Sequence, residues 1–472
     1  MYCGSCMLDN ALVRAMIRQG HDALLVPVYT PIRTDDEDVS LDRVFLGGVN
    51  VYLQQKFSWL RFLPRRFDAF LNQPWLIQKM TANAGNPSPH LLGSLAVSML
   101  KGTDGNQRKE VIRLCDWLEK EIRPDALLLT NLLIGGCIAE FKRRIKAPVL
   151  VTLQGDDIFL DSLPDIYRQP AVVAMRRLVS DVDGFIVHSH DYGNRMAELL
   201  HIPIQKLHVV PLGIDTQDFK IEGASQLKRH GEADPIQPTS KVLSIDVHRS
   251  KCTELNDVEA MNPVEAIHSA KLNKPITIGY FARMAPEKGL HLLIDAFIEL
   301  TRKTQNNDVN LCMAGWMGPQ HASYWNEQQA KLKQANLAGR WSYRGSLARR
   351  EKLGFFRGID LFSVPTTYQE PKGIFLLEAA AAGVPYVQPA HGAFPELHQR
   401  LASGWLYPAG NQQAYINQLE SSVDKIRMCK DLSSKESKES IDLKTVWNEV
   451  SIEQMANRVL DLVMQSTSKH SA

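Results

Sequence analysis

Short apolar runs alternate with amphipathic segments along most of the chain. In the first half, the apolar runs of strand length are residues 23–29, 126–130, 149–154, 184–188 and 207–212. The segments with helical spacing of apolar residues are 7–17, 108–122, 135–145, 171–179 and 192–200. Parallel sheets whose strands are joined by helices produce this alternation, so the pattern predicts an α/β fold.

The alternation weakens at 218–274 and then resumes. The later strand candidates are 276–281, 309–314, 341–343, 361–365 and 385–388, and the helix candidates are 289–302, 324–334, 349–357, 375–382 and 393–401. The pattern therefore predicts an N-terminal domain over 1–217, a linker with an insertion over 218–274, and a second domain over 275–449. A final helix within 450–466 can pack back on the first domain. Residues 57–106 interrupt the alternation and are predicted to form a helical excursion from the sheet, that is, a helical insertion, together with a surface loop.

Composition argues against a nucleic-acid-binding protein, a membrane-spanning protein and a disulfide-rich secreted protein. Among the 472 residues, 54 Lys and Arg nearly balance 52 Asp and Glu, so no strongly basic surface points to nucleic acid. No apolar stretch reaches the about 20 residues that a membrane-spanning helix needs. The first residues lack a secretory signal pattern, and seven cysteines do not suggest a disulfide framework. The expected location is the cytoplasm, with peripheral membrane contact left open.

A glycine-bounded cationic loop follows the strand candidate 276–281. It reads Gly279-Tyr-Phe-Ala-Arg283-Met-Ala-Pro-Glu-Lys288-Gly289 and leads into an amphipathic helix. Loops at the carboxyl ends of parallel strands are where open α/β sheets bind ligands. Arg283 and Lys288 can therefore place two cations on one anion. The alternative is that both are solvated surface cations.

A second loop carries carboxylates. It reads Glu370-Pro-Lys-Gly373-Ile-Phe-Leu-Leu-Glu378, follows the strand candidate 361–365 and opens a helix. The helix N-terminus near Gly373 offers free N–H groups to an anion. Carboxylates repel phosphate, so Glu370 and Glu378 should bind hydroxyl groups instead, although Glu378 could also be an ordinary helix glutamate. Together the two loops describe a site for a sugar nucleotide.

These two loops resemble the donor site of the family 4 retaining glycosyltransferases (glycosyl transferases group 1). The family pattern is a G-x-x-A/G-R-x-x-x-x-K-G loop, then Glu-x7-Glu and a G-x-P segment, which Gly383-Val-Pro385 completes here. The resemblance extends to 210–215, to Gly315 and to the Pro395-Glu396 pair after Gly392. It implies the GT-B fold, in which two Rossmann-like, doubly wound domains face each other across a cleft.

The resemblance also implies roles for single residues. Arg283 and Lys288 would hold the donor diphosphate, Glu378 the ribose, and Glu370 hydroxyls of the transferred sugar. Backbone N–H groups of Gly373, Ile374 and Phe375 would contact the sugar or phosphate, and Gly4 would belong to a first loop that faces the cleft. The implied reaction moves a sugar, a hexose by expectation, from a nucleoside-diphosphate sugar to a hydroxyl acceptor with retention. The cations and the helix end would stabilise the leaving diphosphate electrostatically.

The acceptor side departs from the family pattern. Many members carry a His after the strand that matches 149–153, where this chain has Gln154-Gly155-Asp156. Gln154 can hydrogen-bond a hydroxyl but cannot act as a base. Asp156 could orient the acceptor or take up its proton. Asp156 could equally be a loop carboxylate that caps the next turn.

Three further features have a chemical and a structural interpretation. Asp181-Val-Asp183 matches a short metal-binding pattern but is interpreted as structural, so no metal and no cofactor beyond the sugar nucleotide is expected. Cys3-Gly-Ser-Cys6 could be a redox pair or half of a zinc site. The basic and aromatic run 57–67 could touch an anionic membrane or a lipid-linked acceptor, although core-packed helices also have this composition.

The start of the chain is unusual for this fold. A helical pattern follows directly on Tyr2-Cys-Gly-Ser-Cys6, where a doubly wound domain has a central strand before its glycine turn. The first strand of the N-terminal domain is thus apparently missing, and we expect an upstream start that encodes about ten more residues. Two other functions stay open: a GT-B-like protein that binds a nucleotide without catalysis, and a thiol-redox module. The donor base, the sugar and the acceptor are not determined by the sequence.

Overall fold

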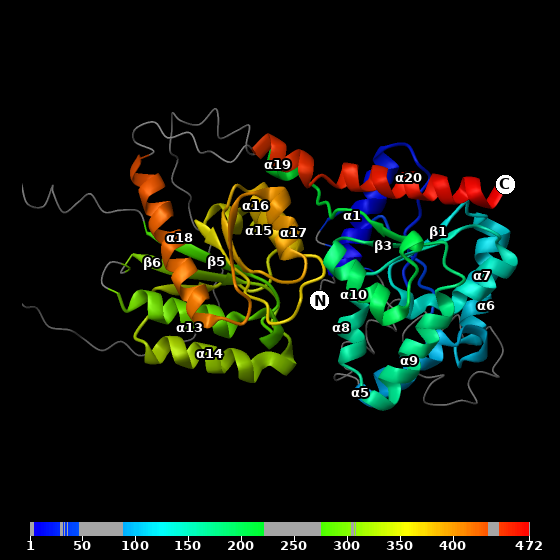
Figure 1. Cartoon of the computed structure of the whole chain (residues 1–472), viewed down its shortest axis with the longest axis horizontal. Helices are drawn as coiled ribbons and strands as arrows, with labels where there is room; N and C mark the ends of the chain where they lie inside the picture. Colours follow the sequence, from blue (N-terminus) through cyan, green and yellow to red (C-terminus); the bar gives the residue numbers. More distant parts are fainter. Residues whose placement is uncertain are drawn as a thin grey trace, which may run out of the picture.

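The chain forms two lobes, each built around a parallel sheet (Figure 1). The computed structural model describes residues 4–28, 32, 34, 36–46, 88–220, 275–303, 306, 308–432 and 443–471. Residues 221–274 of the linker and insertion predicted over 218–274, the run 57–67 and residues 1–3 lie outside these residues. The expectation about a strand before α1 therefore stays a prediction. The predicted α/β architecture with parallel sheets is confirmed.

In the described residues, the first domain holds a four-stranded sheet in the order β1-β2-β3-β4. The strands are β1 (Leu127–Leu129), β2 (Val149–Thr152), β3 (Gly184–Val187) and β4 (Leu207–Val209). The helices are α1 (Gly4–Arg18), α5 (Pro89–Leu100), α6 (Arg108–Trp117), α7 (Ile138–Arg144), α8 (Asp156–Asp161), α9 (Asp165–Leu178) and α10 (His190–Leu200). Short 3₁₀ turns cover Gly102–Asp104, Leu132–Cys137 and Ile204–Lys206, and a π-helical turn covers Leu118–Ile122. All four residues of β2 and of β3 are buried, as expected for central parallel strands.

The second domain holds a six-stranded parallel sheet in the order β10-β9-β8-β5-β6-β7. The strands are β5 (Ile276–Phe281), β6 (Val309–Ala314), β7 (Trp341–Tyr343), β8 (Leu361–Phe362), β9 (Tyr386–Pro389) and β10 (Gly404–Tyr407). The helices are α13 (Leu290–Thr301), α14 (Ala322–Gln334), α15 (Arg349–Arg357), α16 (Ile374–Ala381), α17 (Phe394–Leu401), α18 (Gln412–Leu432) and α19 (Leu443–Glu449), with 3₁₀ turns at Pro286–Lys288 and Pro319–His321. The strand order reverses between β5 and β8, which is the position where doubly wound sheets bind ligands.

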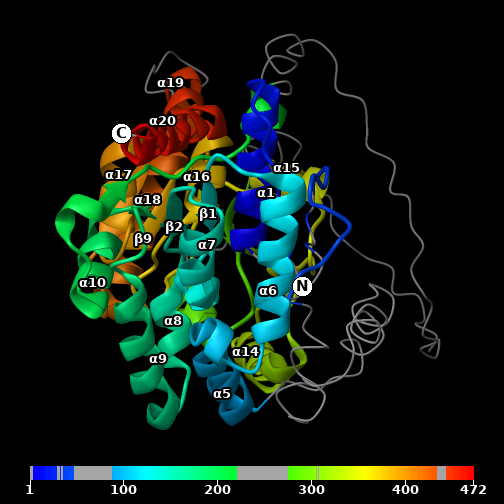
Figure 2. The same cartoon turned by 90° about the vertical axis from the view of Figure 1, so that its right-hand side faces the viewer.

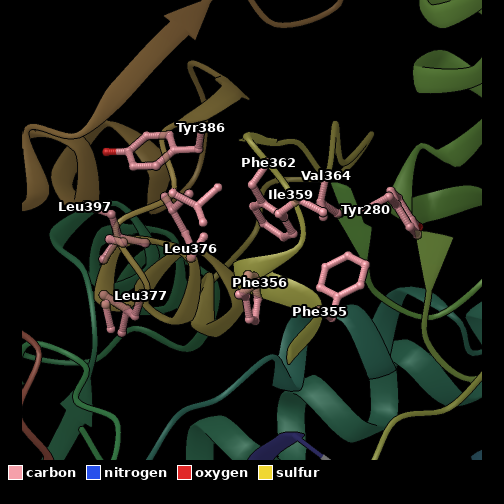
Figure 3. Packing of buried hydrophobic residues seen from close by; sticks show 14 of the residues in the cluster. Tyr280, Phe355, Phe356, Ile359, Phe362, Val364, Leu376, Leu377, Tyr386 and Leu397 are labelled. Atoms are coloured by element: carbon pink, nitrogen blue, oxygen red, sulfur yellow. The ribbon is translucent and has the colours of Figure 1, made fainter. Parts of the chain in front are cut away.

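Aromatic side chains fill the core of the second domain behind that reversal point (Figure 3). Phe355 and Phe356 of α15 and Phe362 of β8 are fully buried, and the Phe356 and Phe362 ring centroids are 5.4 Å apart. Burying each such ring contributes about 1.5–3 kcal/mol. The core therefore fixes α15 against β8, and with them the loops that leave the carboxyl ends of the strands.

The chain crosses between the domains a second time near its C-terminal end. Ile214 and Ser451 form a parallel bridge, and the Ile452 N–H donates to the Ile214 carbonyl over 2.9 Å. Beyond this bridge, α20 (Ile452–Ser471) runs along the first lobe, where the views from two directions place it beside α1 (Figures 1 and 2). An ion pair of 2.8 Å joins Arg18 of α1 to Glu453 of α20.

One predicted strand is wrong. Over 23–29 the described residues form only isolated bridges, from Leu25 to Ser40 and from Val28 to Phe45. Pro27 lies between the two bridging residues and has no N–H to donate, which interrupts a regular ladder. Helix α5 lies within the predicted helical excursion at 57–106, whereas no element was predicted at α8, β10, α18 or α19.

Candidate active site

The two loops singled out in the sequence lie on either side of the strand reversal. The loop with Arg283 and Lys288 follows β5, and the loop with Glu370 and Gly373 follows β8; the two strands are paired, Ile278 opposite Leu361. Both loops therefore leave the same edge of the sheet next to each other. This is the edge that faces the first domain, since Lys372 from the second loop reaches residues of α1 and β2.

Lys288 and Glu370 form a buried ion pair. The Lys288 Nζ lies 2.8 Å from Glu370 Oε2, and the side chains are only 12% and 7% exposed. Tyr368 completes the cluster, because its hydroxyl donates to the same Glu370 oxygen over 2.5 Å and also contacts the Lys288 ammonium. The other Glu370 oxygen accepts the Gly373 N–H at 3.3 Å. The cluster thus holds a cation and a carboxylate at the N-terminus of α16.

Charge and hydrogen bonding keep Glu370 ionised. Burial alone would raise the pKa of Glu370, but the charge of Lys288 and the hydrogen bonds from Lys288, Tyr368 and Gly373 lower it to about 2. Burial and the neighbouring carboxylate raise the pKa of Tyr368, which stays protonated. Glu370 is therefore a permanent hydrogen-bond acceptor, suited to bind hydroxyl groups and not to deliver a proton.

Two glycines allow the loops to approach this cluster. Gly289 has φ 71°, and a Cβ there would lie 1.7 Å from the Pro365 carbonyl oxygen. Gly373 has φ 68°, and a Cβ there would lie 2.7 Å from Leu397 Cδ1. Both conformations favour glycine, which explains why each motif carries one at this point.

Arg283 stands apart from the buried cluster. Its guanidinium pairs with Glu287 over 3.0 Å within the same loop, and its side chain is 42% exposed. The loop therefore brings both predicted cations to the same region, with Lys288 held rigidly and Arg283 accessible to solvent.

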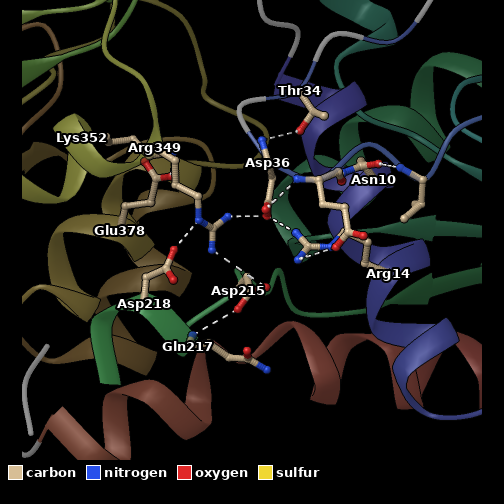
Figure 4. Close-up of polar contacts among 12 residues, drawn as sticks. Asn10, Arg14, Thr34, Asp36, Asp215, Gln217, Asp218, Arg349, Lys352 and Glu378 are labelled. Atoms are coloured by element: carbon tan, nitrogen blue, oxygen red, sulfur yellow. Dashed lines mark hydrogen bonds and ion pairs between the residues drawn. The ribbon is translucent and has the colours of Figure 1, made fainter. Parts of the chain in front are cut away.

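Glu378 lies in a pocket between the two domains. The lining includes Gly4 of α1, Ile374 and Glu378 of α16, and Arg349 and Lys352 of α15. Lys352 donates to Glu378 Oε1 over 2.8 Å, and both side chains are nearly buried (Figure 4). The ion pair holds the carboxylate in place on the pocket wall. A wider pocket lies elsewhere, between α10, β4 and α20, and the described residues that line it include none of the predicted site residues.

Arg349 lines this pocket and forms ion pairs with residues of the first domain. Its guanidinium lies 2.5 Å from Asp36 and 3.9 Å from Asp215, and it also contacts Asp218 (Figure 4). Asp36 and Asp215 belong to the first domain and to its exit toward the linker. Arg349 is not among the residues predicted from the sequence. It lies three residues before Lys352, about one helical turn, so the two side chains share a face of α15.

The first domain contributes Gln154 and Asp156 at the end of β2. The Gln154 side chain donates to Asp9 Oδ1 over 3.1 Å and accepts from Lys372 over 3.2 Å. Asp156 is 2% exposed, and its two oxygens accept the N–H groups of Leu132 and Gln154 over 2.8 and 3.1 Å. Burial raises the pKa of Asp156 to about 6 although both hydrogen bonds lower it.

Both Asp156 oxygens thus accept backbone N–H groups, as a structural carboxylate does, but these belong to residues that precede Asp156 and not to the following turn. The side chain fixes the Gln154 loop against the residues that follow β1. A role of Asp156 toward the acceptor stays a prediction.

The short Asp181–Asp183 pattern is structural as well. Asp183 accepts from Lys142 over 2.8 Å and from the Val149 N–H over 2.6 Å, which ties the residue before β3 to the start of β2. Over the described ranges, no group of three or more His, Cys, Asp or Glu side chains is placed to hold a metal ion. No helix among the same residues has the length and apolar character to cross a membrane.

Two family models match the chain. The family model of glycosyl transferases group 1 matches residues 264–439, and that of the glycosyl transferase 4-like domain matches residues 10–213. The chain belongs to the group 1 glycosyltransferases. Each match spans one of the two lobes, and the group 1 match includes both donor-side loops.

Similar curated proteins include mannosylfructose-phosphate synthase of Agrobacterium fabrum, 32% identical over 23% of this chain and 24% of the relative. D-inositol 3-phosphate glycosyltransferase of Corynebacterium efficiens is 24% identical over 47% of this chain and 50% of the relative. The chain thus spans between a quarter and a half of the length of these curated relatives.

Solved structures share the two-domain GT-B fold. HepE of Anabaena, crystallised with UDP and glucose, has a TM-score of 0.55 at 16% identity and covers 77% of this chain and 84% of its own. Sucrose-phosphate synthase of Thermosynechococcus elongatus has a TM-score of 0.54 at 16% identity, with 76% and 78% coverage. The predicted fold class is therefore confirmed.

The structure adds site residues that the family pattern did not supply. Tyr368, Lys352, Arg349 and Lys372 all contact a predicted residue or its pocket. Tyr368 and Lys372 sit within two residues of Glu370, so a wider reading of that motif could have found them. Arg349 and Lys352 lie in another helix, and their partners are apparent only from the folded chain.

Proposed function

We propose that this group 1 glycosyltransferase moves a hexose from a nucleoside-diphosphate sugar to a hydroxyl acceptor, with retention of configuration. The observation that carries the proposal is the buried Lys288–Glu370 pair at the reversal of the second sheet, with Glu378 in the adjoining interdomain pocket. The HepE structure, which contains UDP and glucose, supports a nucleotide-sugar donor. The names of two relatives include a phosphorylated sugar or inositol, which makes sugar phosphates reasonable acceptors to test.

Each group has a role that follows from its chemistry. Glu378, oriented by Lys352, accepts hydrogen bonds from the ribose hydroxyls. Lys288 and Arg283 neutralise the diphosphate, Arg283 from its exposed position and Lys288 from beside the sugar. Glu370, ionised and anchored, accepts hydrogen bonds from hydroxyls of the transferred sugar.

Catalysis in this proposal is electrostatic. As the sugar–phosphate bond breaks, negative charge grows on the departing diphosphate, and the cations and the α16 N-terminus stabilise that charge. The acceptor hydroxyl attacks on the face from which the diphosphate leaves, and its proton passes to the leaving phosphate oxygen. No protein nucleophile takes part, and no metal is required, so a chelator should leave the rate unchanged.

The first test is donor binding followed by transfer. Thermal-shift and calorimetric titrations with UDP, GDP and ADP identify the base, and the matching sugar nucleotides are then assayed with free sugars, sugar phosphates and alkyl glycosides. Glu370→Ala and Lys288→Ala should each lower kcat at least about 100-fold, because each removes charge or orientation needed at the reacting bond.

Lys303→Ala is the matched control. Lys303 pairs with Glu420 on the surface of the same domain and is 53% exposed, so its removal should leave the rate unchanged. Nucleotide binding without any transfer would favour the non-catalytic alternative, which Gln154 in the acceptor-side position also favours. Equal rates for all three variants would contradict the site assignment.

A further inference from the structure

Lys372 leaves the donor loop and reaches into the first domain. It lies between Pro371 and Gly373, two residues after the Glu370 carboxylate. Its Nζ donates to Ser5 Oγ over 2.8 Å and to Gln154 Oε1 over 3.2 Å. Ser5 belongs to the first turn of α1, and Gln154 follows β2. One side chain of the second domain thus contacts two elements of the opposite domain.

The contact also determines how Gln154 is oriented. The Gln154 amide nitrogen donates to Asp9 Oδ1 over 3.1 Å and to Thr130 Oγ1 over 3.2 Å, while its oxygen faces the ammonium. An amide with a cation on one end and a carboxylate on the other has a single favourable orientation. Gln154 is 8% exposed, so little water competes for these bonds.

We propose that Lys372 is a positioning residue of the transfer step, an inference that rests on the proposed function. The loop that carries Glu370 holds the sugar, and the loop that carries Gln154 lies on the acceptor side of the cleft. Lys372 joins these two loops directly. It therefore sets the distance between the sugar and the incoming hydroxyl, and small errors in such a distance reduce rates steeply.

The proposal separates two steps that the same cleft performs. In the proposed function, nucleotide binding depends on Arg283, Lys288, Glu378 and the α16 N-terminus. The Lys372 ammonium instead donates to Ser5 and Gln154 of the first domain. Removing the Lys372 ammonium should therefore leave nucleotide affinity intact and impair the reaction with the acceptor. Its partner Gln154 should behave in the same way.

A double-mutant cycle tests this coupling. The variants are Lys372→Met, Gln154→Leu and the combination, with Lys372→Arg as the conservative variant and Lys303→Met as the surface control. Calorimetry with the nucleoside diphosphate selected above measures binding. Initial rates with the matching sugar nucleotide measure transfer to the acceptor panel and, separately, hydrolysis of the donor by water.

Lys372→Met and Gln154→Leu should each lower kcat for transfer about 10-fold or more, with nucleotide affinity changed less than about 2-fold. The double variant should be no worse than the poorer single variant, and Lys372→Arg should regain most of the rate. Hydrolysis should fall less than transfer, because water needs no alignment by the acceptor side.

Three results would overturn the proposal. Rate losses of the two single variants that multiply in the double variant would show that Lys372 and Gln154 act separately. Loss of nucleotide affinity in Lys372→Met would assign Lys372 to donor binding, and an unchanged transfer rate would show that it has no role. A wild-type protein that binds no nucleotide would instead contradict the proposed function, and this inference with it.

Discussion

At the scale of single residues, the proposed donor site contains a buried carboxylate that stays ionised. Isolated burial of Glu370 would favour its neutral form, which could donate a proton to phosphate oxygens. The Lys288 ammonium reverses that preference, and Tyr368 adds a hydrogen bond to the same oxygen. A neutral amide at position 370 has a single acceptor oxygen, so its NH2 group would face one of these donors, and Lys288 would lose its counter-charge.

A second buried group makes the protein sensitive to acid. His188 follows β3, its Nδ1 lies 3.0 Å from the Val210 carbonyl oxygen, and its side chain is 5% exposed. Burial lowers the pKa of His188 to about 4; the Val210 hydrogen bond opposes this shift, and the nearby Lys372 and Arg400 charges add to it. The unfolded chain binds the proton near pH 6.5, so the free energy of unfolding should fall as the pH drops from 6.5 to 4.

The full shift in the His188 pKa corresponds to about 3 kcal/mol in the free energy of unfolding. His188→Asn should remove that part of the pH dependence, because the Asn amide can donate to Val210 but does not titrate in this range. Urea unfolding at pH 7, 6, 5 and 4.5 measures it. His201→Asn, at an exposed helix end, should retain the wild-type slope, and equal slopes for His188→Asn and the wild type would contradict the assignment.

At the scale of elements, the loop between β5 and α13 is built on a glycine. A Cβ at Gly289 would overlap the Pro365 carbonyl, so Gly289→Ala must push the β5 loop away from the β8 loop. We expect a loss of several degrees in Tm and at least a 10-fold loss of nucleotide affinity, because Lys288 is the preceding residue.

Gly339→Ala is the matched control for that experiment. Gly339 also has a positive φ, 80°, but open space surrounds it. Its substitution costs only the backbone strain of about 1–2 kcal/mol and should leave nucleotide affinity unchanged. If both variants bind nucleotide like the wild type, close packing of the two loops is not needed for binding.

The elements also show what a sequence can predict. Strands such as β5 and β6 match their predicted ends because most of their residues are buried in the sheet, which produces a largely apolar run. The segment 23–29 has the same run but pairs irregularly around Pro27. Helix α18 was not predicted, although Tyr415, Leu419 and Val423 recur every four residues and are fully buried in the structure. This spacing is the local signal that could have identified it.

In the candidate site, too, residues with a local sequence pattern could be predicted, and contacts between distant residues could not. Glu370, Gly373 and Glu378 could be predicted because their chemistry depends on local spacing at one strand end. The partners Lys372–Gln154 and Arg349–Asp36 could not, because 218 and 313 residues separate them and no local period connects them. Only the approach of two domains creates these contacts.

At the scale of the whole molecule, charged contacts join the domains at more than one place. Glu396 of α17 accepts the N–H groups of His190 and Asp191 at the start of α10, each over 2.8 Å. Arg349 reaches Asp36 and Asp218 beside the first crossing of the chain. These contacts hold the domains in one arrangement around the pocket with Glu378.

Arg349→Met should loosen that arrangement. It leaves Asp36 and Asp218 without this cation, so the domains should sample a wider range of separations, and the radius of gyration from small-angle X-ray scattering should rise. KM for the donor should increase about 10-fold, because the pocket is complete only when both domains contribute to it. Arg302→Met, which breaks a surface pair with Glu299 within one helix, should change neither quantity. An unchanged radius and KM for Arg349→Met would contradict this role.

The bridge between Ile214 and Ser451 shows that the two domains differ in continuity: the second domain is one continuous stretch of the chain, and the first is not. The second domain enters and leaves through neighbouring backbone segments, so it is a continuous cassette inserted between α1–β4 and α20. The second domain can therefore be exchanged as one piece for that of another glycosyltransferase. In the proposed function, the exchange would change the donor preference and leave the acceptor side, in the first domain, unchanged. The first domain cannot be cut out in this way, since α20 must be rejoined to cover α1.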